Sequence, residues 1–192
     1  MMARLFAKKG FVVFSINYRL APRATYPAAL EDIFTAAEWI HDHAEEYGAD
    51  NRRWVVAGES AGANLTCGLV IANSSPRPEP GAQNIFDRNL PIQCALPACG
   101  ILQVSGSERF ARRKPKIPTL LADRIEGVCN GYLGEHEAPH GLADPVCVLE
   151  SDWVPERPLP PMMAVVGTRD PILNDSRRLC AALDARDVPN EL

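Results

Sequence analysis

Ser60 lies in a glycine-flanked pentapeptide whose residue types suit nucleophilic chemistry. The pentapeptide, Gly58-Glu59-Ser60-Ala61-Gly62, follows an apolar run at 54–57 and precedes a helix-favouring stretch at 63–67. The spacing predicts a tight turn from strand to helix, called the serine turn below. In such a turn the two glycines let strand and helix approach closely, and the serine takes a strained conformation with its hydroxyl exposed. Such a serine can attack an electrophile once a base accepts its proton. The alternative interpretation of the pattern is a glycine-rich turn that carries an incidental serine.

The elements around the serine turn alternate between predicted strands and predicted helices. Short apolar runs predict strands at 11–16, 53–57, 95–104 and 162–167, and apolar residues spaced three or four apart predict helices at 28–47, 61–72, 119–132 and 175–186. Residues 1–10 have the pattern of a helix end that stops at Gly10, and 74–91 has the composition of a loop. This order predicts an α/β fold with a mostly parallel sheet flanked by helices and joined by right-handed crossovers.

Length and composition favour one domain over residues 1–192, with a less regular, lid-like region at about 105–155. The formal net charge of −4, from 20 basic and 24 acidic residues, argues against nucleic acid as a partner. No apolar stretch approaches the ~20 residues that span a bilayer, and the N-terminus lacks the features of a signal peptide. We therefore expect a cytoplasmic protein without a membrane span.

The six cysteines are predicted to be free thiols, and no metal site is expected. They form neither C-x-x-C pairs nor a dense disulfide framework, and several lie in apolar surroundings, which favours a reducing compartment. The histidines at 41, 43, 136 and 140 lack ligand spacing relative to these cysteines. We expect the first two histidines on a solvated helix face and the other two in loops.

Four segments together resemble the hormone-sensitive-lipase-like carboxylesterases, a group with the α/β-hydrolase fold, type 3. They occur in family order at 18–22 (YRLAP), 26–32 (YPAALED), 58–65 (GESAGANL) and 167–176 (GTRDPILNDS). One departure is Arg23, where the family usually has glutamate, so the charge near the floor of the site differs. Arg19 and Asp32 are expected to pair beneath the site.

The resemblance implies that Ser60 is the nucleophile and that Asp170 is the acid that orients an imidazole. The N–H of Ala61 would be one donor of the oxyanion hole, which stabilises the tetrahedral intermediate. Asp170 follows the predicted strand at 162–167, where an aspartate can also cap the next helix. Asp175 and Ser176 fit that capping role better.

The resemblance also implies parts that the 192 residues do not contain. In this fold the order is Ser, acid, His, but no histidine follows His140, and no His-Gly-Gly-Gly loop precedes Gly10. The chain is therefore expected to be a partial α/β-hydrolase, truncated at both ends, without the N-terminal strands and the last strand. The absent oxyanion-loop strand would lie between 11–16 and 53–57. We predict that these two strands either pair directly or leave a gap in the sheet.

The predicted function is hydrolysis of small, short-acyl esters by a serine carboxylesterase, with this chain an incomplete and poorly active fragment. Removal of one triad member leaves only about 10³–10⁴-fold catalysis over water. This chemistry requires no cofactor. Two alternatives stay open, namely a non-catalytic ligand-binding module on a hydrolase scaffold and one half of a split esterase that needs a complementing segment. A homo-oligomer is compatible with each.

Overall fold

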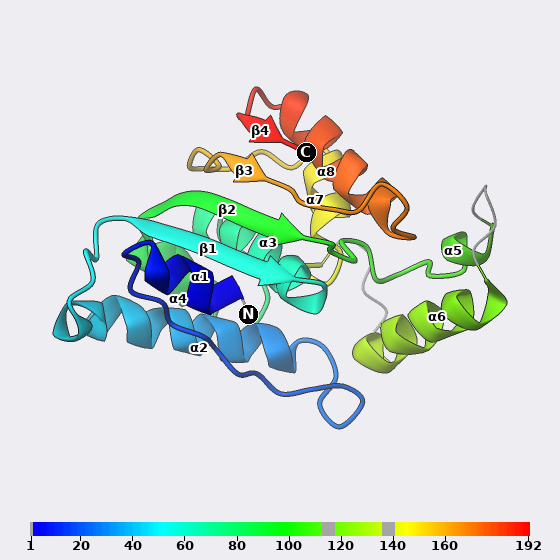
Figure 1. Ribbon diagram of the computed structural model, residues 1–192, viewed down its shortest axis with the longest axis horizontal. Coiled ribbons are helices and arrows are strands. Elements are labelled where there is room, and N and C mark those ends of the chain that lie inside the picture. Colours follow the sequence, from blue (N-terminus) through cyan, green and yellow to red (C-terminus); the bar gives the residue numbers. More distant parts are fainter. Residues whose placement is uncertain (1, 113–117, 136–140) are drawn as a thin grey trace.

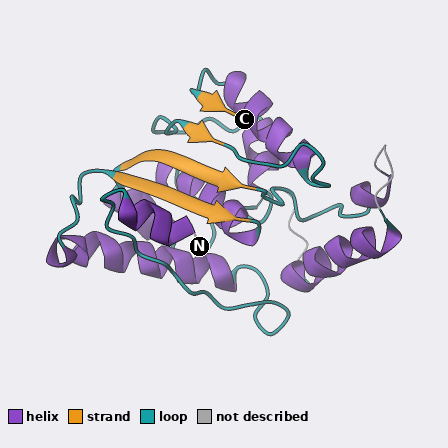
Figure 2. Cartoon of the chain, viewed as in Figure 1, coloured by secondary structure: helices purple, strands orange, loops and turns teal. Residues whose placement is uncertain are grey.

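The serine turn follows the first strand of a parallel sheet. The computed structural model describes residues 2–112, 118–135 and 141–192. Within these residues the strands are β1 (Trp54–Glu59), β2 (Ile92–Ala98), β3 (Met162–Met163) and β4 (Asn190–Glu191), paired in that order. Every pairing is parallel, and helices lie against the sheet (Figures 1 and 2). The α/β fold class predicted from the sequence is confirmed.

Helices connect the strands and bury them. In the described part of the chain these helices are α1 (Met2–Lys8), α2 (Ala28–His43), the 3-10 turn η1 (Ala44–Tyr47), α3 (Ala61–Ser74), α4 (Ala82–Arg88), α5 (Arg109–Arg112), α6 (Thr119–Leu133), α7 (Pro145–Glu150) and α8 (Leu173–Asp184). The helix behind the serine turn, α3, contacts β1, β2, α2, α4 and α7, which explains why it is apolar on nearly all sides. Figure 1 shows α5 and α6 beyond the carboxyl ends of β1 and β2.

The predicted long helix at 28–47 is present as α2 followed by η1. The apolar residues of α2 that are buried include Leu30, Ile33 and Phe34, in agreement with the spacing in the sequence. The segment ends at Gly48, which has a φ of 77°, a conformation that glycine adopts without steric cost. The helices predicted at 61–72, 119–132 and 175–186 are present as α3, α6 and α8, with ends shifted by one or two residues.

The predicted strand at 11–16 is wrong. This segment has no strand structure, and Phe11, Val12 and Val13 are 49%, 43% and 37% exposed. A strand requires a neighbour for its backbone donors and acceptors, and among the described residues β1 pairs only with β2. Direct pairing of 11–16 with β1 is therefore absent, and β1 is left as an edge strand.

Other boundaries in the middle of the chain also differ from the prediction. The expected loop at 74–91 contains α4, and the expected irregular region contains α5 and α7 besides α6. The third strand, β2, ends at Ala98 rather than at 104, because the next residue, Cys99, has a φ of 48° and leaves the strand conformation. The fourth strand is shorter than predicted, with an isolated bridge between Ala98 and Val165 beyond it. The final residues, β4, pair with β3.

Two of the six thiols lie deep in the hydrophobic core, and all six are free. Burial raises the pKa of Cys67 to about 12 and that of Cys129 to about 11. The thiolate is the reactive species, so both residues should resist alkylation at about pH 8. We expect iodoacetamide to modify them at least about tenfold more slowly in the folded chain than in urea, as measured by peptide mass spectrometry. Equal rates in both conditions would contradict the placement of these thiols in a packed core.

Candidate active site

The serine turn has the geometry of a sharp corner between β1 and α3. Ser60 is exposed and has a φ of 56° and a ψ of −116°, outside the regions that non-glycine residues prefer. Its N–H donates to the carbonyl oxygen of Ala98 at 2.9 Å, which ties the corner to the end of β2. The serine is thus fixed at the carboxyl end of the parallel strands, where α/β sheets place their ligands.

Gly58 is the residue of this corner that has no room for a side chain. A Cβ on Gly58 would lie 2.1 Å from the carbonyl oxygen of Gly62, a backbone atom. A Cβ on Gly62 meets no heavy atom within 4 Å. The close approach of strand and helix therefore depends on the first glycine of the pentapeptide, and the described residues leave room at the second.

The start of α3 supplies hydrogen-bond donors next to Ser60. Ala61 is the first residue of α3, and the first N–H groups of a helix have no partner inside it. Together with the helix dipole, such donors stabilise negative charge that develops beside them. The N–H of Ala61 can therefore serve an oxyanion that forms next to the hydroxyl of Ser60.

Asp170 lies on the loop between β3 and α8, called the acid loop below (residues 167–172). Its N–H donates to the carbonyl oxygen of Gly167 at 2.9 Å, and its Oδ1 accepts the N–H of Ile172 at 2.9 Å. Burial first, and then the nearby charge of Asp170, raise the pKa of the thiol of Cys99, the residue after β2. The N–H of Cys99 donates to the carbonyl oxygen of Val165 at 2.7 Å, and the N–H of Ser60 bonds to Ala98. Residues 98 and 99 therefore link the serine turn with the segment that leads into the acid loop.

The capping role expected for Asp175 and Ser176 is wrong. The residue before α8 is Ile172, and no side chain caps this helix. Asp175 is buried, with 1% of its surface exposed, and it points to another segment of the chain. Its Oδ2 accepts the N–H groups of Leu102 at 3.0 Å and Gln103 at 3.3 Å.

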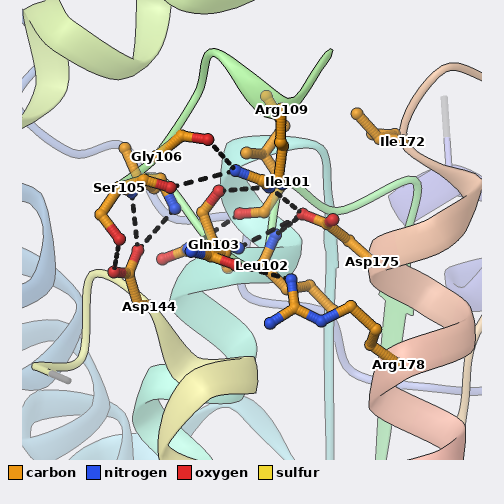
Figure 3. Close-up of polar contacts among 12 residues, drawn as sticks. Ile101, Leu102, Gln103, Ser105, Gly106, Arg109, Asp144, Ile172, Asp175 and Arg178 are labelled. Carbon is orange, nitrogen blue, oxygen red and sulfur yellow. Dashed lines mark hydrogen bonds and ion pairs between the residues drawn. The ribbon is translucent and has the colours of Figure 1, made fainter. Parts of the chain in front are cut away.

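Two buried carboxylates hold the segment that follows β2, residues 101–106 (Figure 3). Asp175 binds its first part and pairs with Arg109 at 2.8 Å. Asp144, also 1% exposed, accepts the N–H groups of Val104 and Ser105 and the hydroxyl of Ser105. The bonds of Asp175 tie residues 102 and 103, which follow the end of β2, to the first turn of α8, which follows the acid loop. The sequence carried no signal for these contacts, whose partners lie 40 and 73 residues apart.

Burial controls the charge on Asp175. Loss of solvent raises the pKa of its carboxyl above the ordinary value, while Arg109 and the N–H donors of residues 102 and 103 oppose that shift. The carboxylate is therefore held by a cation and two backbone dipoles in a site that water does not reach.

The expected pair of Arg19 and Asp32 is present. The Nε of Arg19 donates to both carboxylate oxygens of Asp32, and Glu31 lies 3.0 Å from the same guanidinium. This pairing lowers the pKa of Asp32. Both side chains lie near the protein surface, where water screens the pair, so it contributes little to stability.

His41 and His43 lie on α2, where the ring of His43 stacks on Trp39. His136 and His140 fall outside the described residues. Within the described ranges no group of three or more histidine, cysteine or acidic side chains is arranged to hold a metal ion. No described helix is both long and apolar enough to cross a bilayer. A cavity of about 520 Å³ lies between residues 14–17 and α2, and neither Ser60 nor Asp170 lines it.

Two features define a protein of the α/β-hydrolase class. A strained serine lies between a strand of the parallel sheet and a helix, and the acid loop follows a later strand. The chain matches the family described as alpha/beta hydrolase fold over residues 1–192, and it belongs to this family. The resemblance to the hormone-sensitive-lipase-like group, stated from the sequence, is confirmed.

Relatives and solved structures agree with this assignment. The chain is 31% identical over 191 residues to Esterase LipI of Mycobacterium tuberculosis, covering 94% of this chain and 52% of that protein. Esterase LipQ of the same organism is 26% identical, with coverage of 95% and 40%. A hyperthermophilic esterase from the archaeon Pyrobaculum calidifontis has a TM-score of 0.76 and 27% identity, covering 98% of this chain and 58% of that one. The chain thus spans about half the length of these proteins.

Proposed function

We propose that this chain forms the nucleophile-and-acid part of a serine carboxylesterase that hydrolyses small, short-acyl esters. Ser60 attacks the ester carbonyl, the N–H of Ala61 stabilises the oxyanion, and Asp170 orients the imidazole that takes the serine proton. The alcohol leaves with that proton, and water then releases the acid and restores Ser60. The proposal needs no metal or organic cofactor.

One observation carries this proposal. An exposed serine with a φ of 56° stands at the start of a buried helix. The segment that anchors it, residues 98 and 99, also bonds to Val165, just before the acid loop that carries Asp170. Strained backbone conformations persist where the surrounding structure enforces them, and they concentrate at functional sites. The names of the relatives, esterases LipI and LipQ, support the same reaction class.

The proposal includes a base that lies outside these 192 residues, since no histidine follows Asp170. The open edge of β1, where Val55 is 43% exposed, favours completion of the sheet by a further segment, either in a longer chain or in a separate polypeptide. Free thiols favour a reducing compartment, for which the cytoplasm is the proposed location.

A fluorophosphonate probe tests the nucleophile and the missing base in one experiment. We expect slow labelling of Ser60 in the chain alone and an increase of at least about tenfold when free imidazole is added, since a positioned base typically contributes about 10²–10⁴-fold. The exposed Ser15 serves as the reference site within the same molecule. The variant Ser60→Ala should lose the label at position 60 and keep the labelling rate of Ser15. Peptide mass spectrometry assigns the label.

Two outcomes would count against the proposal. Rapid labelling of Ser60 without imidazole would mean that the chain supplies its own base. Labelling of Ser60 no faster than that of Ser15 at every imidazole concentration would remove the nucleophile role and favour the alternative, a ligand-binding module on a hydrolase scaffold.

A further inference from the structure

We infer that Asn64 is a positioning residue for Ser60, because its side-chain amide holds the first turn of α3 in place. The inference rests on the proposed function, in which Ser60 is the nucleophile and the N–H of Ala61 serves the oxyanion. Asn64 follows Ser60 by about one turn of the helix.

The side chain of Asn64 is buried and donates hydrogen bonds to two distant segments. The residue is 4% exposed, and its Nδ2 donates to the carbonyl oxygens of Ile101 and Ala143, each at 2.8 Å. These acceptors follow β2 and precede α7, and they lie 37 and 79 residues further along the chain. A side-chain amide nitrogen carries two hydrogens, so both are used. The amide therefore ties the beginning of α3 to two separate segments.

Within the described residues, only the nitrogen end of this amide forms hydrogen bonds. The Oδ1 of Asn64 is buried and accepts no hydrogen bond there, a cost that an apolar side chain of similar size would avoid. Both acceptors are carbonyl oxygens, so the nitrogen is the end that must face them. The two donated hydrogen bonds, rather than the filling of space, therefore account for an asparagine at this position of a largely apolar helix.

Ser60 and Asn64 bind the two ends of one short segment, residues 98–101. The backbone N–H of Ser60 donates to the first carbonyl oxygen of this segment at 2.9 Å, and the side chain of Asn64 donates to the last at 2.8 Å. The segment lies close against α3, since a Cβ added to Gly100 would come within 2.9 Å of the Cβ of Ala63. The first turn of α3 is thus attached to the segment on both sides of this contact.

The double attachment explains how the strained backbone of Ser60 persists. A residue with a φ of 56° and a ψ of −116° keeps this conformation only where the surrounding structure enforces it. The bond to Ala98 fixes the strand side of the serine turn. Asn64 fixes the helix side, where the carbonyl oxygen of Ser60 accepts the N–H groups of Ala63 and Asn64. Release of the helix side would let Ser60 relax and would move the N–H of Ala61 with it.

Asn73 provides a matched control at the other end of α3. Its side chain also forms two hydrogen bonds, donating to the carbonyl oxygen of Leu90 at 3.0 Å and accepting the N–H of Leu90 at 2.8 Å. The next residue, Pro91, accepts the N–H of Trp54 at 2.9 Å at the start of β1. The two asparagines thus anchor opposite ends of one helix, and the N–H groups of Ser60 and Trp54 report on these ends separately.

Amide hydrogen exchange measured by NMR tests the inference. In Asn64→Ala, the exchange rate of the Ser60 N–H divided by that of the Trp54 N–H should rise at least about fivefold, the factor that corresponds to one net hydrogen bond. In Asn73→Ala the same ratio should stay unchanged or fall. A general loss of stability accelerates both amides and leaves the ratio unchanged, so the ratio isolates an effect on the serine turn.

A second variant, Asn64→Leu, separates the donors of the side chain from its volume. Leucine fills a similar space without a donor, so this variant should raise the ratio as Asn64→Ala does. An unchanged ratio in Asn64→Leu, or equal ratios in Asn64→Ala and Asn73→Ala, would overturn the inference. Failure of both variants at position 64 to fold would also overturn it, because Asn64 would then support the whole domain rather than the serine turn. Neither amide requires Ser60 to react, so failure here is distinct from failure of the proposed function.

Discussion

Replacement of Gly58 by alanine is expected to remove the serine turn. The added Cβ would lie 2.1 Å from the carbonyl oxygen and 2.3 Å from the carbonyl carbon of Gly62. Overpacking costs about 1–3 kcal/mol when side chains can yield, but both atoms here belong to the backbone of α3. We therefore expect the free energy of unfolding to fall by at least about 3 kcal/mol, a large share of the ~5–15 kcal/mol of a typical domain. Urea unfolding followed by far-UV circular dichroism measures this loss.

The matched control is Gly62→Ala, four residues further along the same turn. A Cβ at this position meets nothing within 4 Å, and Gly62 lies in the first turn of α3. Alanine is favoured over glycine inside a helix by up to about 1 kcal/mol, so stability should stay unchanged or rise slightly. Equal losses in the two variants would mean that the close contact at Gly58 does not exist in the folded chain.

Local patterns were sufficient to predict the part of the fold that surrounds Ser60. The run at 54–57 and the pentapeptide after it identified β1, the serine turn and α3, because apolar periodicity and glycine spacing are encoded within a few residues. The same holds for α2, whose buried face follows the helical period. Such elements depend mainly on their own side chains.

The prediction failed where structure depends on distant partners. Residues 11–16 have the composition of a buried strand, yet no neighbouring strand pairs with them among the described residues. The anchoring of residues 102–105 by Asp144 and Asp175 joins segments that are remote in sequence. A single sequence does not reveal which backbone N–H a buried carboxylate meets, because many exposed and buried aspartates look alike in it.

Asp175→Ala is expected to destabilise the chain strongly although it lies outside the serine turn. It leaves the N–H groups of Leu102 and Gln103 without their acceptor and removes the partner of Arg109. Breaking a buried charge pair from one side costs about 3–5 kcal/mol. We expect a loss of that order in the free energy of unfolding, measured by urea titration. Asp123→Ala on the exposed face of α6 is the control and should change stability by no more than about 0.5 kcal/mol.

The pH dependence of the free energy of unfolding separates the effect of the charge of Asp175 from the effect of its shape. Because burial raises its pKa above the unfolded value, its contribution to stability is largest below the unfolded pKa and declines as pH rises through the folded one. Asp175→Asn keeps the shape and stays neutral. The difference in unfolding free energy between the native chain and this variant should therefore move in favour of the native chain as pH falls from about 7 to about 4. A difference that stays constant over this range would mean that the carboxyl of Asp175 titrates alike in the folded and unfolded chain. That result would contradict its desolvation in the core.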